Sequence, residues 1–205
     1  MSSPQKLMLP LLSLLEEESF QTQTARLYQL YASLHALLYL HGAVRSREVL
    51  PLLRELAPEC SEALALRWMK AGFDCAWHPS AGMLLIHPGL AEPEALKDIR
   101  PLPRSLLELD PEQIYGDIPG VLPEETAVFC RMTGLLQDAV RPELTPEEAT
   151  EDLLILAKQN VAEPVMQEVL ATLVTVHPSP AMKEVARLIS RQTPRWPGFS
   201  PGVVN

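Results

Sequence analysis

The sequence predicts a mainly α-helical fold, with one short β-hairpin in the first half and a helical bundle in the second. Apolar residues recur at spacings of three and four along most of the chain, which is the period of amphipathic helices. Aromatic residues make up only 5% of the composition and leucine is abundant, which favours aliphatic helix packing over a β-sandwich. Hydrophobic residues at 47% and charged residues at 21% are typical of a folded globular chain.

The longest periodic element is a helix expected to begin after Thr22 or Thr24, either of which can cap its first turn. Gly42 is expected to end this helix. Its predicted buried stripe consists of Leu27, Leu30, Tyr31, Leu34, Leu37, Leu38 and His41.

Two shorter helices and a hairpin are expected next. Ser46 can cap a helix that stops before Pro58, and Ser61 can cap another that ends at Gly72. The apolar face of the first is predicted to hold Val49, Leu52, Leu53 and Leu56, and that of the second Leu64, Trp68 and Ala71. From Phe73 the period changes to two, with Cys75 and Trp77 alternating with other residues. Turn-forming residues at 78–82 and a second apolar run at 83–87 complete the predicted hairpin.

Three helices of decreasing length followed by a two-stranded hairpin form a unit that resembles the winged-helix arrangement over about residues 24–90. The resemblance is one of element order and not of a family motif, so it implies a fold and little about function. In a winged helix that binds DNA, the third helix would lie in the major groove.

The second half is predicted to be a bundle of sequential antiparallel helices. The first is expected from Pro123 to about Val140, with Glu124 and Glu125 complementing its dipole. The strongest local signal is Thr145-Pro146-Glu147-Glu148, in which Thr145 and Glu148 can form a capping box for a helix to about Asn160. Two more helices are expected at 164–176 and from Ser179 onward.

The predicted organisation is an apolar helical segment at 1–20, a winged-helix-like unit at 21–100, a Pro-rich bridging segment at 101–123, an acidic helical bundle at 124–193 and an extended tail at 194–205. The net charge of −9 is unevenly distributed. Residues 21–100 carry eight basic and eight acidic side chains, whereas residues 101–205 carry eight and fifteen. An acidic surface disfavours binding of nucleic acid or anionic membranes by the second half.

Cysteine usage favours a reducing, cytoplasmic location. Cys60, Cys75 and Cys130 are odd in number and scattered, which argues against a disulfide framework. The apolar run 7–15 contains Pro10 and is followed by three glutamates, which is atypical of a secretory signal. No run of residues is long enough to span a bilayer.

Motifs for catalysis or cofactor binding are not found. A zinc site from Cys60, Cys75, His78 and His87 lacks the usual ligand pairing, so we expect no metal and no cofactor. Cys130 has no neighbouring base, and no GxSxG, GxGxxG, HExxH or phosphate-binding glycine loop occurs. Acidic pairs such as Glu147 with Glu148 are better explained as helix first turns.

Surplus apolar helical surface therefore predicts a non-enzymatic protein-binding module, such as an adaptor, a chaperone-like protein or a subunit of an assembly, homodimers included. The expected partner-binding residues are Leu7, Leu11, Leu14, Tyr28, Tyr39, Trp196 and Phe199. For the apolar segment and for the tail aromatics, burial against the protein's own core is the open alternative. A DNA-binding regulator is the second hypothesis, with contacts from Arg45, Arg47, Arg67 and Lys70. An enzyme with dispersed catalytic residues is the third.

Overall fold

The computed structural model describes residues 18–58, 60–96, 99–102 and 121–196. Most of the predicted apolar segment at 1–20, most of the bridging segment and the tail beyond residue 196 lie outside these ranges. Within them the fold is mainly α-helical with one small antiparallel sheet, which confirms the predicted fold class. No helix in this part of the chain is both long and apolar enough to cross a membrane.

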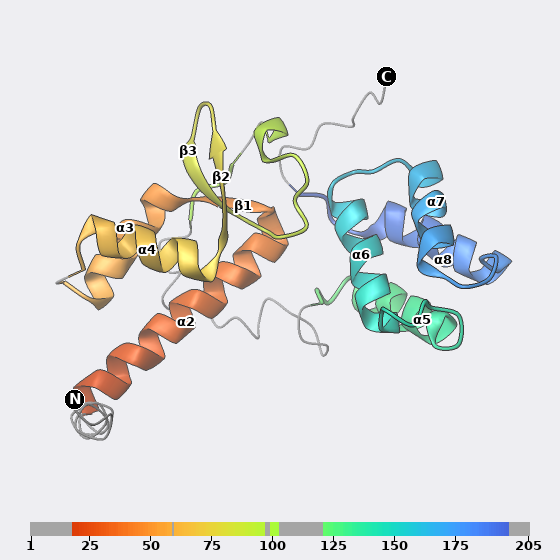
Figure 1. The fold of residues 1–205 in the computed structure, drawn as a ribbon, viewed down its shortest axis with the longest axis horizontal. Helices are drawn as coiled ribbons and strands as arrows, with labels where there is room; N and C mark the ends of the chain where they lie inside the picture. The colour runs from red at the N-terminus through yellow and green to blue at the C-terminus, as the bar shows by residue number, and fades with distance from the viewer. Residues whose placement is uncertain (1–17, 59, 97–98, 103–120, 197–205) are drawn as a thin grey trace, which may run out of the picture.

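The N-terminal unit has the element and strand order of a winged helix, with the sheet ordered β1-β3-β2 (Figure 1). Its elements are α2 (Glu18–His41), β1 (Ala43–Arg45), α3 (Ser46–Leu56), α4 (Glu62–Gly72), β2 (Asp74–His78) and β3 (Gly82–Ile86). Strand β1 was not predicted, because three residues are too few to show a period of two.

Local signals account for most of the helix boundaries in this unit. Gly42 ends α2 with a φ of +79°, a left-handed conformation that glycine adopts without strain. Ser61 caps α4 as predicted, its hydroxyl accepting a bond of 3.2 Å from the Leu64 N–H. The predicted cap at Ser46 is wrong: Arg45 is the N-cap of α3, and the Ser46 hydroxyl instead donates to the Met83 carbonyl at 2.8 Å.

The sheet has a buried core on each face. Val44 and Cys75 both pair with Leu85, so these three side chains share the face that α2, α3 and α4 cover. Ala43 and Leu84 contribute to the opposite face, whose cover is provided by Leu90, Leu96, Ile99 and Trp196. The short 3-10 helix η1 (Pro93–Ala95) belongs to this covering segment.

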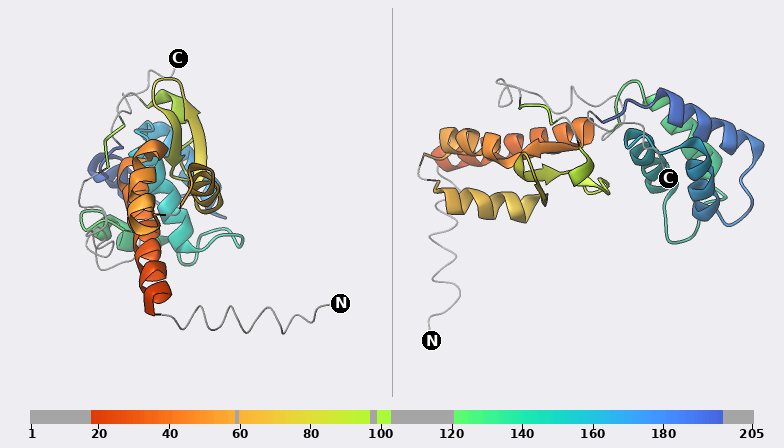
Figure 2. Two further views of the ribbon diagram at one scale, coloured as in Figure 1. Left: turned by 90° about the vertical axis from the view of Figure 1, so that its left-hand side faces the viewer. Right: turned by 90° about the horizontal axis from the view of Figure 1, so that it is seen from above.

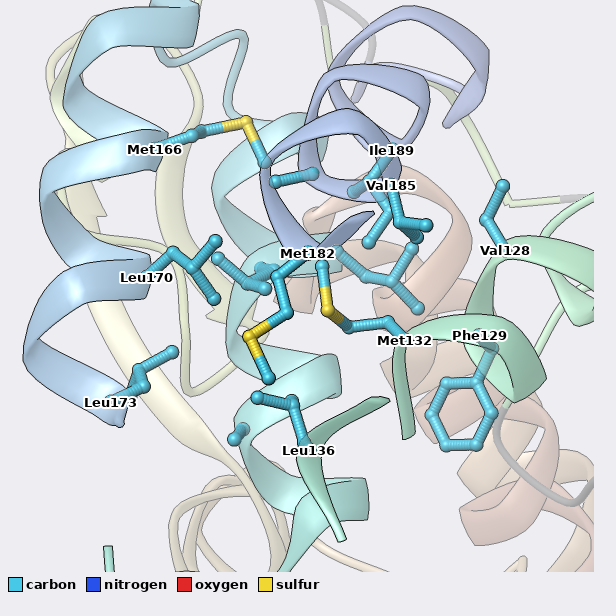
Figure 3. Close-up of a cluster of buried hydrophobic side chains, with 14 of the residues drawn as sticks. Val128, Phe129, Met132, Leu136, Met166, Leu170, Leu173, Met182, Val185 and Ile189 are labelled. Atoms are coloured by element: carbon cyan, nitrogen blue, oxygen red, sulfur yellow. The ribbon is translucent and has the colours of Figure 1, made fainter. Parts of the chain in front are cut away.

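The C-terminal unit is a bundle of helices α5 (Thr126–Leu136), α6 (Pro146–Lys158), α7 (Glu163–Leu173) and α8 (Pro180–Gln192). Figure 3 shows Met132, Met166 and Met182, from three different helices, pointing into the common core. The capping box is confirmed: the Glu148 N–H donates to the Thr145 hydroxyl at 3.2 Å, and the Thr145 N–H donates to the Glu148 carboxylate at 2.8 Å.

The first helix of the bundle begins later and ends earlier than predicted, because residues on both sides have other partners. The Glu125 side chain turns into the interior, and Val140 pairs with Val174 in an isolated antiparallel bridge. The two units lie side by side along the long axis of the molecule, with α6 facing the C-terminal end of α2 (Figures 1 and 2). This contact positions the polar junction described below.

Candidate functional site

The structure describes three of the seven predicted partner-binding residues. Tyr28 is 72% exposed on the first half of α2, where a partner can reach it. Tyr39 and Trp196 are instead buried between the two units, so their predicted role on an outer surface needs correction. Trp196 instead covers the protein's own core, which was the alternative prediction for this residue. Leu7, Leu11, Leu14 and Phe199 lie outside the described residues.

Helix α4 is rotated relative to the prediction. Ala65 and Met69 are its fully buried residues, while Leu64 is 52% exposed and Ala71 is also exposed. Apolar residues occur on every side of this helix, so periodicity did not identify which side faces the core. As a result, an aliphatic side chain lies on the outer face of the helix that would read DNA in a winged helix.

Strand β2 presents a second exposed apolar side chain. Trp77 pairs with Met83, close to the hairpin turn, and is 74% exposed. The alternating pattern correctly placed Trp77 on the same face as Cys75, but it did not indicate that β2 is an edge strand on which Trp77 stays exposed. Trp77 and Leu64 are therefore candidate contact residues that the sequence did not identify.

The predicted DNA-contact residues are not equally available. Arg47, Arg67 and Lys70 are exposed on α3 and α4. Arg45 is paired with Glu48 at 2.9 Å, so its charge is already compensated within the chain. The hairpin turn at 79–82 carries no lysine or arginine. The exposed positive charge on this face is therefore smaller than the sequence hypothesis assumed.

A buried polar cluster joins the two units, and we call Tyr39, His87, Glu125, Lys158 and Trp196 the junction. The Glu125 carboxylate accepts hydrogen bonds from the Lys158 ammonium at 2.5 Å and from the Tyr39 hydroxyl at 2.8 Å. Glu125 is 0% and Lys158 1% exposed, so this ion pair is cut off from solvent. The ammonium also lies 4.3 Å from the centre of the Tyr39 ring, within the range of a cation–π contact.

The ion pair compensates only in part for the cost of burying its charges. Burial lowers the pKa of Lys158, whereas attraction to Glu125 and the hydrogen bond between them act in the opposite direction. Neither charged group is accessible to a substrate, so the arrangement fits a structural connection between the units rather than a catalytic pair.

Trp196 connects three parts of the molecule at the junction. Its indole N–H donates to the Tyr39 carbonyl and its backbone N–H to the Lys158 carbonyl, each at 2.8 Å. The ring packs so closely on Gly42 that a Cβ added there would lie 2.9 Å from the indole. The His87 ring is 5.3 Å away, centre to centre. Trp196, which the sequence placed in an extended tail, is thus part of the core.

His87 makes the junction sensitive to acid. Burial, followed by the positive charge of Lys158 and the influence of His35, lowers the pKa of His87 from 6.5 to about 4, with Asp74 acting in the opposite direction. The unfolded chain therefore binds a proton at a higher pH than the folded chain does. Stability contributed by the neutral ring is present at pH 7 and is lost as the pH falls from 6.5 toward 4.

We expect this residue to account for a loss of roughly 2 kcal/mol of unfolding free energy between pH 7 and pH 4, after allowance for partial exposure of the ring. Urea unfolding followed by circular dichroism at several pH values measures the loss. The variant His87→Phe should show a correspondingly flatter pH dependence. Equal slopes for the two proteins would contradict the assignment.

Sequence reasoning missed the junction because Glu125 was assigned to a helix first turn. One signal was available: Lys158 follows Leu154 by four residues and so lies on the buried stripe of α6. A lysine at such a position needs a buried partner. Neither member of the resulting pair could be matched to the other from the sequence, because 33 residues separate them.

The residues weighed as metal ligands have other partners. The His78 ring shares a hydrogen bond of 2.9 Å with the Leu96 carbonyl, and His87 accepts one of 3.0 Å from the Gly89 N–H. Burial raises the pKa of the Cys75 thiol. No group of three or more potential ligands occurs among the residues whose placement is described.

Comparisons of this chain with protein-family models, with curated proteins and with solved structures found no match.

Proposed function

We propose that this chain is a non-enzymatic protein-binding module whose winged-helix-like unit docks a partner through exposed apolar side chains. The observation that supports the proposal is the exposure of Leu64 on α4 and Trp77 on β2. These elements correspond to the recognition helix and the wing, where DNA-binding relatives of the fold present mainly polar and basic side chains. Tyr28 on α2 adds a third exposed position.

The chemistry of these side chains suits a protein interface. Tryptophan and tyrosine are enriched among the residues that contribute most to protein–protein binding. A tryptophan with 74% of its surface in water gains free energy when a partner covers it. The acidic net charge adds a preference for partners other than nucleic acid.

Affinity purification with matched variants tests this function. Leu64→Ser and Trp77→Ala should each lose proteins that the unaltered chain captures, while both variants keep its melting temperature. Val176→Ser is the control, because Val176 is 62% exposed on the C-terminal unit and is not part of the proposed surface. If all three variants capture the same proteins as the unaltered chain, neither Leu64 nor Trp77 contributes to docking.

Duplex DNA binding is the second candidate, favoured by the exposure of Arg47, Arg67 and Lys70. Three phosphate contacts would give a dependence of log K on log salt with a slope of about −3. Fluorescence anisotropy with a labelled duplex measures this slope. Binding at physiological salt that disappears in the double variant Arg67→Ala/Lys70→Ala would favour DNA over protein as the partner.

A further inference from the structure

A cavity of about 220 Å³ opens where the C-terminal end of α4 meets β2 and α2. Its walls come from His35 on α2, residues 70–72 at the end of α4, Phe73, Asp74 at the start of β2, Ile86 at the end of β3, and Pro88. This volume can hold a small ring or the end of a long side chain. Its lining includes neither the junction residues nor the exposed apolar positions on α4 and β2, although Ile86 and Pro88 flank His87.

The cavity wall includes acceptors of hydrogen bonds. Lys70 and Ala71 lie in the last turn of α4, where helix carbonyls lack intrahelical N–H partners and carry the negative end of the helix dipole, whereas the Gly72 backbone is engaged by His35. The capping N–H of Phe73 is used by the Met69 carbonyl. Asp74, which follows directly, adds an exposed carboxylate.

His35 supplies a further acceptor. Its Nε2 atom is buried and has no hydrogen-bond partner among the described residues, an arrangement that is uncommon in folded proteins. Burial lowers the pKa of His35, with the Gly72 backbone acting in the opposite direction, so the ring is neutral at physiological pH. The ring stacks on Phe73 with centres 4.6 Å apart, so Phe73 holds the imidazole in place at the cavity wall.

We propose that this cavity binds a compact organic cation, namely an amidinium, guanidinium or primary ammonium group. Its N–H groups donate to the Asp74 carboxylate, to the His35 Nε2 atom and to carbonyls of the last turn of α4. Lys70 is the one positive group in the wall, and it is exposed and forms no ion pair with Asp74 among the described contacts. Its ammonium can therefore move into solvent when the cation enters.

Benzamidine is the probe, titrated into the full chain and followed by amide chemical shifts in NMR spectra. We expect saturable shifts at residues 70–74, and we expect benzoate, which has the same ring and the opposite charge, to bind more weakly. Asp74→Asn should weaken benzamidine binding about tenfold. Lys70→Ala should strengthen it roughly threefold, because a like charge is removed. The control Glu62→Gln removes a carboxylate from the opposite end of α4 and should leave the affinity unchanged.

These variants separate a cation site from an anion site by the sign of each effect. Tighter binding of benzoate, weaker benzamidine binding in Lys70→Ala, or the absence of saturable shifts at residues 70–74 would overturn the proposal.

A capped Gly-Arg-Gly peptide distinguishes two sources of the cation. Binding of the peptide as tight as that of benzamidine indicates an arginine of a partner protein, and binding of benzamidine without the peptide indicates a free small molecule. Both tests are independent of the proposed docking function.

Discussion

Replacing Glu125 with alanine is expected to lower the free energy of unfolding by about 3–5 kcal/mol. The change leaves the Lys158 ammonium in an interior where it is 1% exposed, and it removes the acceptor of the Tyr39 hydroxyl. An unpaired buried charge costs far more than the net contribution of the ion pair itself. Urea denaturation at pH 7, followed by circular dichroism, measures the loss.

Two further variants test the cause of this effect. The triple replacement Tyr39→Phe/Glu125→Leu/Lys158→Met removes all three polar groups together and should recover most of the lost stability, because apolar groups of similar size can replace a buried ion pair. Arg187→Ala should cost at most about 1 kcal/mol, since its ion pairs with Glu163 and Glu184 are exposed. A loss in Glu125→Ala no larger than that in Arg187→Ala would show that the junction pair is solvated.

Trp196→Ala is expected to cost about 3–5 kcal/mol and to separate the unfolding of the two units. The substitution empties the space beside Gly42 and His87 and leaves the Tyr39 carbonyl without its donor. Calorimetry should show one transition for the unaltered chain and two for the variant. Small-angle X-ray scattering should show a larger radius of gyration as the units move apart.

A matched tryptophan substitution serves as the control for that result. Trp77→Ala removes the same side chain from a position that is 74% exposed, so its effect on unfolding should stay within about 0.5 kcal/mol. Trp196→Phe keeps most of the apolar contact and loses only the indole donor, for an expected cost of about 1 kcal/mol. If Trp196→Ala and Trp77→Ala are equally mild, Trp196 does not hold the units together.

The elements of this fold were predictable where a local signal specifies them. The capping box of Thr145 and Glu148 and the cap at Ser61 depend on residues within one helical turn, so the sequence contains both partners. The winged-helix order followed from helix lengths and a change of period. The outer face of α4 was not predictable from the pattern, because Leu64 and Ala65 are adjacent, both apolar, and only the packing of neighbouring elements selects between them.

The candidate sites were less predictable than the fold, since they depend on contacts between distant residues. Lys158 interrupts an apolar stripe and so indicated that a buried partner was needed. The carboxylate that pairs with it belongs to Glu125, which directly precedes α5. The cavity beside His35 is formed by residues of α2, α4, β2 and β3, whose relative placement is a tertiary property. Exposure of Trp77 likewise depends on the position of β2 at the edge of the sheet.

The bond between Trp196 and Tyr39 spans 157 residues, and this distance has a consequence for biosynthesis. At translation rates of about 5–20 residues per second, the ribosome adds Trp196 roughly 8–30 seconds after Tyr39. Until Trp196 is added, the nascent winged-helix-like unit carries Ala43 and Leu84 without the indole that later covers them. A chaperone that shields this patch on the growing polypeptide would protect it from aggregation until its cover has been made.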